Sequence, residues 1–480
     1  MARVGQQLRL PDITPEADQK PFAARAEALA MAAIGIGAHA AQTMAHAAAI
    51  AWWRARVEAA GGNPDLVSAA AFTGPLLKLP EAILTEAKNL GRDIAALPVA
   101  EGCAELGRLY THLLPSARRA AEGIYYTPPM LVRRLLNKAE WAGHDWLTGS
   151  AIDPSCGGGA FLVEGATRTA AAMPNAEPAI MLAAIAGRLR GWDIDPLGCW
   201  LAQIVVEAVL LPQIILSGKR LPQITECRDA LKYFEKGKGQ FGLVMGNPAF
   251  GKIKKTAEMG RKFARSLYGH PNLYGMLTDV AVHLAKADSG IIAYLTPTSY
   301  LSGEYFKNLR KLLAEEARPV SIDIVESRTA AFTGVLQEVA LSCLKRGRTE
   351  NRAACSVIHV DADGLRVDEN GALVLPPKPG EPWILPRSKA DAALVERLAQ
   401  MPTRLRDWGY RVSTGPLVWN RHKERLHSSR APGRYPVIWA EAVTTDGKFS
   451  LQAAKSNHRE RAWFTPSKTK DPNLVRKGAC

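Results

Sequence analysis

Residues 150–162 read SAIDPSCGGGAFL, and this stretch decides the fold. A short apolar run ends at Asp153, three glycines follow, and helix-forming residues begin at Ala160. Glycines after a strand let a ligand approach the backbone, and the amides of such a loop can hold a carboxylate or a phosphate. The stretch therefore predicts a strand, a ligand-binding turn and a helix. It disfavours a nicotinamide dehydrogenase, because Leu162 occupies the third glycine position of the dinucleotide fingerprint.

Apolar runs of the same kind recur up to residue 347, and most are separated by segments of helix-forming composition, such as 278–287 and 305–316. This alternation predicts a doubly wound α/β sheet, in which ligands bind at the carboxyl ends of strands. The last two runs have no room for a long helix between them and are expected to pair antiparallel at the sheet edge. The runs are SAID (150–153), GWDID (191–195), ITECRDA (224–230), FGLVMGNP (241–248), GIIAYLTP (290–297), VSIDIVES (320–327) and VALSCLKR (339–346).

Composition divides the chain into four segments around this α/β region. Residues 1–115 carry strong helix formers and predict a helical N-terminal domain. Residues 116–347 form the α/β domain. Residues 348–385 contain prolines and glycines that predict a linker, and residues 386–480 form a basic C-terminal domain.

The positive charge concentrates in the last part of the chain. The whole sequence has 61 Lys and Arg against 46 Asp and Glu, and residues 381–480 alone have 19 against 9. Such an excess favours an acidic partner, namely nucleic acid or an anionic membrane. The same segment contains Trp408, Trp419, Trp439 and Trp463, which a solvated tail would not need.

Several protein classes are disfavoured by what the sequence lacks. None of the seven cysteines forms a CxxC motif, so we expect neither a disulfide framework nor a metal site, and free thiols in the cytoplasm. The first residues have no apolar core of a signal peptide. Residues 28–53 lack charged side chains, but their many alanines and polar interruptions favour a packed helix, so no membrane partner is expected.

Two further strand ends carry acids. In GWDIDP (191–196), Asp193 can accept hydrogen bonds from both hydroxyls of a ribose, whereas Asp195 is placed to cap the next helix. In CRDA (227–230), Asp229 could cap a helix or, after the first two motifs, meet a purine amino group.

Five motifs in this order resemble the gamma-class N6-adenine DNA methyltransferases of restriction–modification systems. They are GIYYTPP (123–129), DPSCGGGAFL (153–162), GWDIDP (191–196), CRDA (227–230) and NPAF (247–250), and the resemblance covers about residues 120–347. It implies a seven-stranded, mostly parallel Rossmann-like sheet, S-adenosylmethionine as methyl donor, and a target-recognition domain in the C-terminal segment. The implied partner is double-stranded DNA.

The catalytic pattern of that family is Asn or Asp, then Pro-Pro and an aromatic residue. The resemblance implies that the Asn247 side-chain oxygen and the Pro248 carbonyl accept the amino hydrogens of a flipped-out adenine, on which Phe250 stacks. This contact would direct the nitrogen lone pair toward the methyl group. Ala249 stands where the family has a second proline. It removes no side-chain hydrogen bond but loosens the loop, so a weakly active or inactive relative stays an alternative.

The resemblance also implies which residues bind the cofactor and which bind DNA. Tyr126 and Tyr125 could equally be core aromatics or ligand contacts. The expected cofactor contacts are Thr127, Pro128, Asp153, Ser155, Gly157, Gly159, Phe161, Asp193, Asp229 and Ala230. The expected DNA contacts are Lys252, Lys254, Lys255, Arg421, Lys423 and Arg425.

Other functions stay open at this point. Asn-Pro-x-aromatic loops also occur in enzymes that methylate RNA or protein glutamine, and a DNA-binding protein could retain the scaffold without turnover. The first 115 residues show no nuclease pattern, so no DNA cleavage is expected. The recognition segment 386–480 is short for the family. This favours a truncated recognition domain or a separate specificity or restriction subunit as partner.

Overall fold

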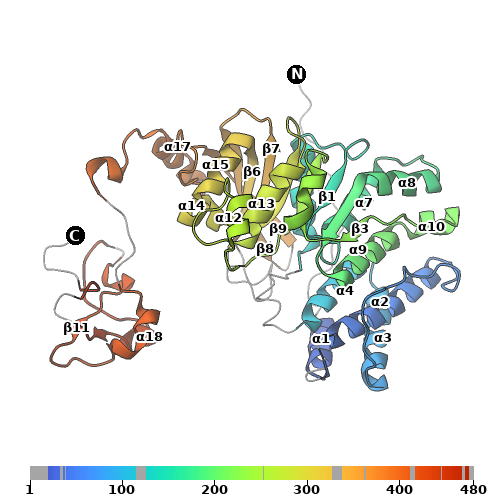
Figure 1. Ribbon diagram of the computed structural model, residues 1–480, viewed down its shortest axis with the longest axis horizontal. Helices are drawn as coiled ribbons and strands as arrows, with labels where there is room; N and C mark the ends of the chain where they lie inside the picture. The colour runs from blue at the N-terminus through green and yellow to red at the C-terminus, as the bar shows by residue number, and fades with distance from the viewer. Residues whose placement is uncertain are drawn as a thin grey trace. The chain divides into compact units, whose positions relative to one another are not determined.

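The computed structural model describes residues 20–32, 36–37, 39–114, 126–251, 253–326, 338–361, 364–410, 417–444, 446–467 and 471–474. Tyr125 and Lys252 therefore lie outside the described residues. The chain divides into two compact units, residues 1–400 and 401–480 (Figure 1).

The first unit is built on a mixed sheet with the strand order β3-β2-β1-β4-β5-β7-β6-β8-β9. Each of the seven apolar runs contains a strand, so their assignment as strands is confirmed. Neighbouring strands are parallel from β3 to β5, β7 is antiparallel to both of its neighbours, and β8 is parallel to β6. The strands are β1 (Ala151–Asp153), β2 (Leu189–Asp193), β3 (Thr225–Cys227), β4 (Leu243–Gly246), β5 (Ile291–Pro297), β6 (Ala317–Val325), β7 (Val339–Arg346), β8 (Arg352–Asp361) and β9 (Gly364–Val374).

Within the described residues the sheet has nine strands, where seven were expected. The additional two come from residues 348–385, the expected linker, in which β8 and β9 pair antiparallel. Asp361 is the last residue of β8 and Gly364 is the first residue of β9, so this part of the expected linker belongs to a hairpin. The antiparallel pairing of β6 and β7 is confirmed. Their place at the sheet edge is wrong, because β8 and β9 extend the sheet beyond β6.

The sheet is doubly wound. From its centre, the chain proceeds from β1 to β2 and β3 in one direction and from β4 to β5 in the other. Because crossovers between parallel strands are right-handed, α7 and α9 cover one face and α13 covers the other. A crevice opens where the direction reverses, between β1 and β4. The helices of this region are α6 (Pro129–Trp141), α7 (Ala160–Ala171), α8 (Pro178–Arg188), α9 (Pro196–Val209), α10 (Leu211–Ser217), α11 (Ala230–Tyr233), α12 (Ala257–Lys262), α13 (Leu273–Leu284), α14 (Ser299–Ser302), α15 (Lys307–Glu316) and α17 (Ala392–Gln400).

The N-terminal helices share a core with the α/β region. The helices are α1 (Lys20–Ala32), α2 (Ala40–Ala59), α3 (Glu81–Ala95) and α4 (Val99–Leu113). Their buried side chains, including Trp52 and Trp53, belong to one cluster with Leu197, Trp200 and Ile204 of α9. The predicted boundary at residue 115 thus marks a change in sequence character, while the buried core continues across it.

The second unit contains a small antiparallel sheet in the order β10-β12-β11. Its elements are β10 (Leu426–His427), β11 (Tyr435–Pro436), β12 (Trp463–Phe464) and α18 (Ser456–Arg459).

Among the described helices, none alone has both the length and the apolar character to cross a membrane. Only α9 and α10 taken together, bent by 73°, reach that length and composition.

Candidate functional site

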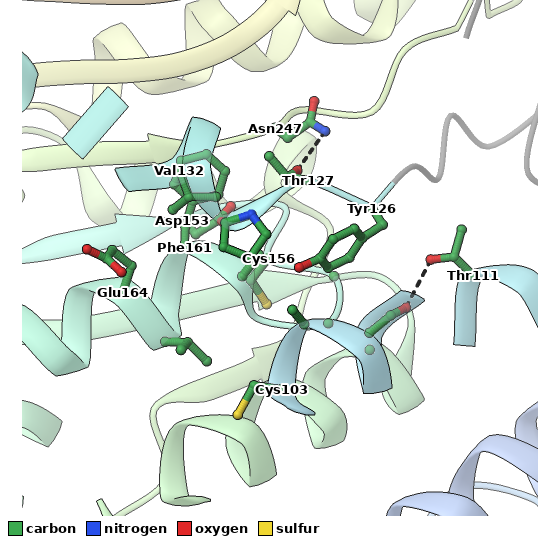
Figure 2. Close-up of a pocket in the computed structure, with 18 of the residues that line it drawn as sticks. Cys103, Thr111, Tyr126, Thr127, Val132, Asp153, Cys156, Phe161, Glu164 and Asn247 are labelled. Atoms are coloured by element: carbon green, nitrogen blue, oxygen red, sulfur yellow. Dashed lines mark hydrogen bonds between the residues drawn. The ribbon is translucent and has the colours of Figure 1, made fainter. Parts of the chain in front are cut away.

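The carboxyl ends of β1, β2 and β4 surround a pocket with an empty volume of about 1070 Å³, part of it open to solvent (Figure 2). It brings together residues that lie far apart in the sequence, as the strand order requires. Of the sequence-predicted residues, Thr127, Asp153, Ser155, Gly157, Phe161, Asp193 and Asn247 line it.

Asp153 ends β1 at the bottom of this crevice and is only 1% exposed. Its carboxylate accepts a hydrogen bond from the backbone N–H of Ser155 at 3.0 Å. Burial raises the pKa of the Asp153 carboxyl well above its usual value. A cationic ligand in the pocket would lower the pKa of Asp153 again, so the site is suited to a positively charged ligand.

Gly246 must be glycine because β4 passes directly beside Asp153. Its φ of +150° is rare for other residues, and an added Cβ would lie 2.6 Å from Asp153 Oδ1.

We expect Gly246→Ala to lower the free energy of unfolding by about 2–3 kcal/mol, because the methyl group must displace a buried carboxylate. Urea unfolding followed by circular dichroism would measure this. The matched control is Gly187→Ala on α8, where an added Cβ meets nothing within 4 Å. Equal stability of the two variants would contradict the expectation.

Two glycines of the loop after β1, Gly157 and Gly159, have different structural roles. Gly157, with a φ of +47°, would point a Cβ into open space, whereas a Cβ on Gly159 would lie 2.8 Å from Ala202 Cα of α9. Gly157 therefore leaves room for a ligand, and Gly159 permits helix packing. The predicted ligand role fits Gly157, while Gly159 caps α7 without lining the pocket.

Asp193 and Asp195, at the end of β2, make different contacts. The Asp193 carboxylate accepts hydrogen bonds from the backbone N–H groups of Gly157 and Asp195, both at 2.9 Å. Burial raises its pKa to about 6. The capping role expected for Asp195 is confirmed, since its side chain accepts from the Leu197 N–H at the start of α9. Its other oxygen accepts a hydrogen bond from the Tyr110 hydroxyl.

Asn247 follows β4 and carries an acceptor that the described residues leave unused. Its amide nitrogen donates to Thr127 Oγ1 at 3.0 Å, which joins the NPAF loop to the TPP segment (Figure 2). Within the described part of the chain, the buried Asn247 Oδ1 has no hydrogen-bond partner. A buried acceptor without a donor costs about 1–3 kcal/mol, so the site favours a ligand that brings an N–H or O–H.

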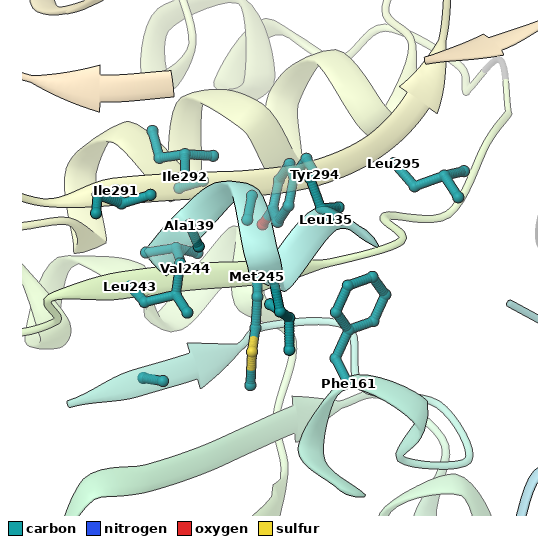
Figure 3. Close-up of a cluster of buried hydrophobic side chains, with 14 of the residues drawn as sticks. Leu135, Ala139, Phe161, Leu243, Val244, Met245, Ile291, Ile292, Tyr294 and Leu295 are labelled. Atoms are coloured by element: carbon teal, nitrogen blue, oxygen red, sulfur yellow. The ribbon is translucent and has the colours of Figure 1, made fainter. Parts of the chain in front are cut away.

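The NPAF loop lies on a tightly packed base. Side chains of β4 and β5, including Met245 and Tyr294, are buried against Leu135 and Ala139 of α6 (Figure 3). Phe250 belongs to the same core and meets the Tyr274 ring edge-on, with centroids 6.2 Å apart. A stack of Phe250 on a base stays a prediction.

Besides Gly159, three predicted cofactor contacts do not line the pocket. The Asp229 carboxylate caps α11 by accepting from the Leu231 N–H, and Ala230 is buried behind it. Pro128 precedes α6 as its N-cap residue. Contact of these residues with a cofactor stays a prediction. For Asp229, the sequence also allowed a helix cap, and the structure shows that cap at the start of α11.

One wall of the pocket was missed by sequence reasoning. It comes from α4 of the N-terminal helices, and a Cβ on Gly158 would lie 3.3 Å from Gly107 Cα, so helix and loop nearly touch. The signal was the small residues Ala100, Ala104 and Gly107 at helical spacing. The pocket-lining residues outside the predicted set are Ala100, Cys103, Ala104, Gly107, Tyr110, Thr111, Tyr126, Pro129, Val132, Arg133, Cys156, Gly158, Ala160, Val163, Glu164, Asp195 and Gly198.

The predicted DNA contacts fall into two groups. Lys254 and Lys255 are exposed in the first unit, and Arg421 and Lys423 are exposed in the second. Arg425 is different, because its guanidinium binds Asp471, donates to the Thr465 carbonyl and lies 4.5 Å from the Phe464 ring centroid. These contacts stabilise the unit, and contact of Arg425 with DNA stays a prediction.

Comparison with known proteins shows similarity to methyltransferases of restriction-modification systems. Residues 206–332 match the model of the Eco57I restriction-modification methylase family. The Type II methyltransferase M.BsuBI of Bacillus subtilis is 26% identical over 208 residues, which are 42% of this chain and 41% of that protein. The Type II methyltransferase M.PstI of Providencia stuartii is 27% identical over 180 residues, covering 35% of this chain and 34% of that protein. The chain thus spans less than half the length of either relative.

Among solved structures, the type IIG restriction endonuclease BpuSI has a similar fold. The match has a TM-score of 0.50 and 16% identity, and it covers 73% of this chain and 45% of that one. At this identity the likeness concerns the α/β fold alone.

Proposed function

We propose that this protein is a site-specific DNA methyltransferase that transfers a methyl group from S-adenosylmethionine to N6 of a flipped-out adenine. The observation that carries the proposal is the unpartnered Asn247 Oδ1, held by Thr127 beside an acid-lined pocket. An exocyclic amino group supplies the N–H donor that this oxygen lacks. Orienting the amino nitrogen toward the methyl donor is enough for the reaction, so no covalent intermediate with the protein is needed.

The residues of the pocket fit S-adenosylmethionine, which when bound supplies an electrophilic methyl group on a sulfonium. Asp193, which lines the pocket, would accept hydrogen bonds from the ribose hydroxyls. The buried Asp153 would offset the positive charge of the cofactor. Ser155 Oγ, buried and without a partner in the described residues, would bind the polar amino acid end.

DNA is the proposed substrate because the relatives named above are Type II methyltransferases and a restriction-modification methylase family. Lys254 and Lys255 follow the NPAF loop and are exposed, so they can contact phosphates next to a flipped base. In the second unit, the exposed Arg421 and Lys423 offer further phosphate contacts.

The proposal is tested by expressing the chain in a host without its own adenine methylases and sequencing the DNA with detection of N6-methyladenine. Methylation at a defined sequence, absent with Asn247→Ala, is the expected outcome. Unmethylated DNA together with labelled methyl transfer to RNA or to protein glutamine would replace DNA as the substrate. Binding of S-adenosylmethionine without any transfer would identify an inactive relative.

We expect cofactor affinity to depend on pH through Asp193. Ribose hydroxyls donate to the carboxylate, and with a pKa of about 6 this group becomes protonated as the pH falls. Affinity should therefore be about tenfold weaker at pH 5 than at pH 7. Isothermal titration calorimetry with S-adenosylhomocysteine measures this, and Asp193→Asn serves as the non-titrating control. The same slope in both proteins would exclude Asp193 as the cause.

A further inference from the structure

The charges that line the pocket are unevenly distributed. Four acids face it, namely Asp153, Glu164, Asp193 and Asp195. Among the described residues that line the pocket, Arg133 is the one cationic side chain. A ligand that carries a carboxylate would be repelled by the acids, and a single position offers a compensating charge.

Arg133 lies on the face of α6 that is turned to the pocket, one turn after Pro129 and next to Val132. It is half-buried and makes no ion pair with a described residue. Its neighbour Arg134, in contrast, binds the buried Asp323 at 2.8 Å. Arg133 is therefore available to a ligand, whereas Arg134 is used by the fold.

The backbone around Arg133 is held in place by the neighbouring helix. Arg168 of α7 donates to the Arg133 carbonyl at 3.2 Å and binds Glu164 at 2.8 Å. Arg168 therefore contacts both the Arg133 backbone and the Glu164 side chain, and both residues line the pocket. The lining of the pocket thus includes the Arg133 cation together with the acids Asp153 and Glu164.

We propose that Arg133 binds the α-carboxylate of the methionine part of S-adenosylmethionine, with Glu164 and Asp153 facing its α-ammonium group. This inference rests on the proposed function, because it assigns one end of the same cofactor. The methionine part is a zwitterion, and a cation beside two acids matches its two charges. A guanidinium can bind a carboxylate with two parallel hydrogen bonds, which also fixes the direction of the chain that leads to the sulfonium.

The test compares two ligands that differ by one group. S-adenosylmethionine carries the carboxylate, and decarboxylated S-adenosylmethionine has a hydrogen in its place. We expect Arg133→Gln to weaken S-adenosylmethionine by about 10- to 100-fold in isothermal titration calorimetry and to leave the decarboxylated ligand within about threefold. Arg133→Lys should recover part of the affinity for S-adenosylmethionine.

Lys138→Gln is the matched control, because Lys138 is a cation on the same helix and does not line this pocket. Circular dichroism establishes that each variant is folded. Unchanged binding of S-adenosylmethionine by Arg133→Gln, or an equal loss for both ligands, would overturn the inference alone. Failure of the wild-type protein to bind S-adenosylmethionine would overturn the proposed function itself, so the two failures are distinguishable.

Discussion

Replacing Asn247 by alanine is expected to lower kcat for adenine methylation by about 100- to 1000-fold while S-adenosylmethionine still binds within about threefold. The substitution removes Oδ1, the unpartnered acceptor that would hold the target amino group, and leaves the acids and the glycine loop in place. Single-turnover transfer of a labelled methyl group to DNA measures the rate, and calorimetry measures the affinity.

Thr127→Val refines this test. Valine retains the shape of threonine but cannot accept the hydrogen bond from the Asn247 amide, so the amide loses its orientation while Oδ1 remains. We expect a smaller loss, about tenfold in kcat. If the rate of Asn247→Ala were within threefold of the wild-type rate, Asn247 would have no catalytic role. The main argument for a substrate with an amino group would then be lost.

The largest effect on stability is expected at Arg310, which is 1% exposed on α15. Its guanidinium donates five hydrogen bonds, at 2.8–3.1 Å, to backbone carbonyl groups. These carbonyls belong to Tyr300, Gly303, Gly380 and Glu381. Arg310 therefore ties the segment after β9 to the helices of the sheet.

Arg310→Met should lower the free energy of unfolding by about 3–5 kcal/mol, because methionine fills the space but removes all five hydrogen bonds that the guanidinium donates. Chemical denaturation gives the value. The adjacent Lys311 is exposed, so Lys311→Met is the control and should change stability by less than about 0.5 kcal/mol. Similar stabilities of the two variants would show that water replaces the guanidinium.

The sequence predicted the elements whose signal is local. Each strand from β1 to β7 coincides with a short apolar run, and Asp153, Asp193 and Asn247 mark the carboxyl ends of β1, β2 and β4. Because parallel strands have these ends at the same edge, Asp153, Asp193 and Asn247 were expected together, and all three line the pocket. The geometry of the Asn247 amide was not predictable, since it depends on a contact with Thr127, 120 positions earlier.

Other features depend on tertiary contacts that no local pattern encodes. The hairpin of β8 and β9 lies in a segment whose glycines and prolines predicted a linker, and its pairing with β6 makes it part of the sheet. Arg425 looks like its exposed neighbours in sequence, and its role follows from Asp471, 46 positions later. The α4 wall was missed because the small residues of α4 do not identify the segment of the chain that they pack against.

The position of α4 sets the smallest piece of this protein that could be transplanted. A segment that begins at residue 123 would retain every motif but would lack Tyr110, Cys103 and the glycine contact at Gly107 that complete the pocket. It would also expose the face of α9 that Trp52 and Trp53 cover. Chimeric proteins should therefore carry the chain from α2 to residue 400 as one continuous segment.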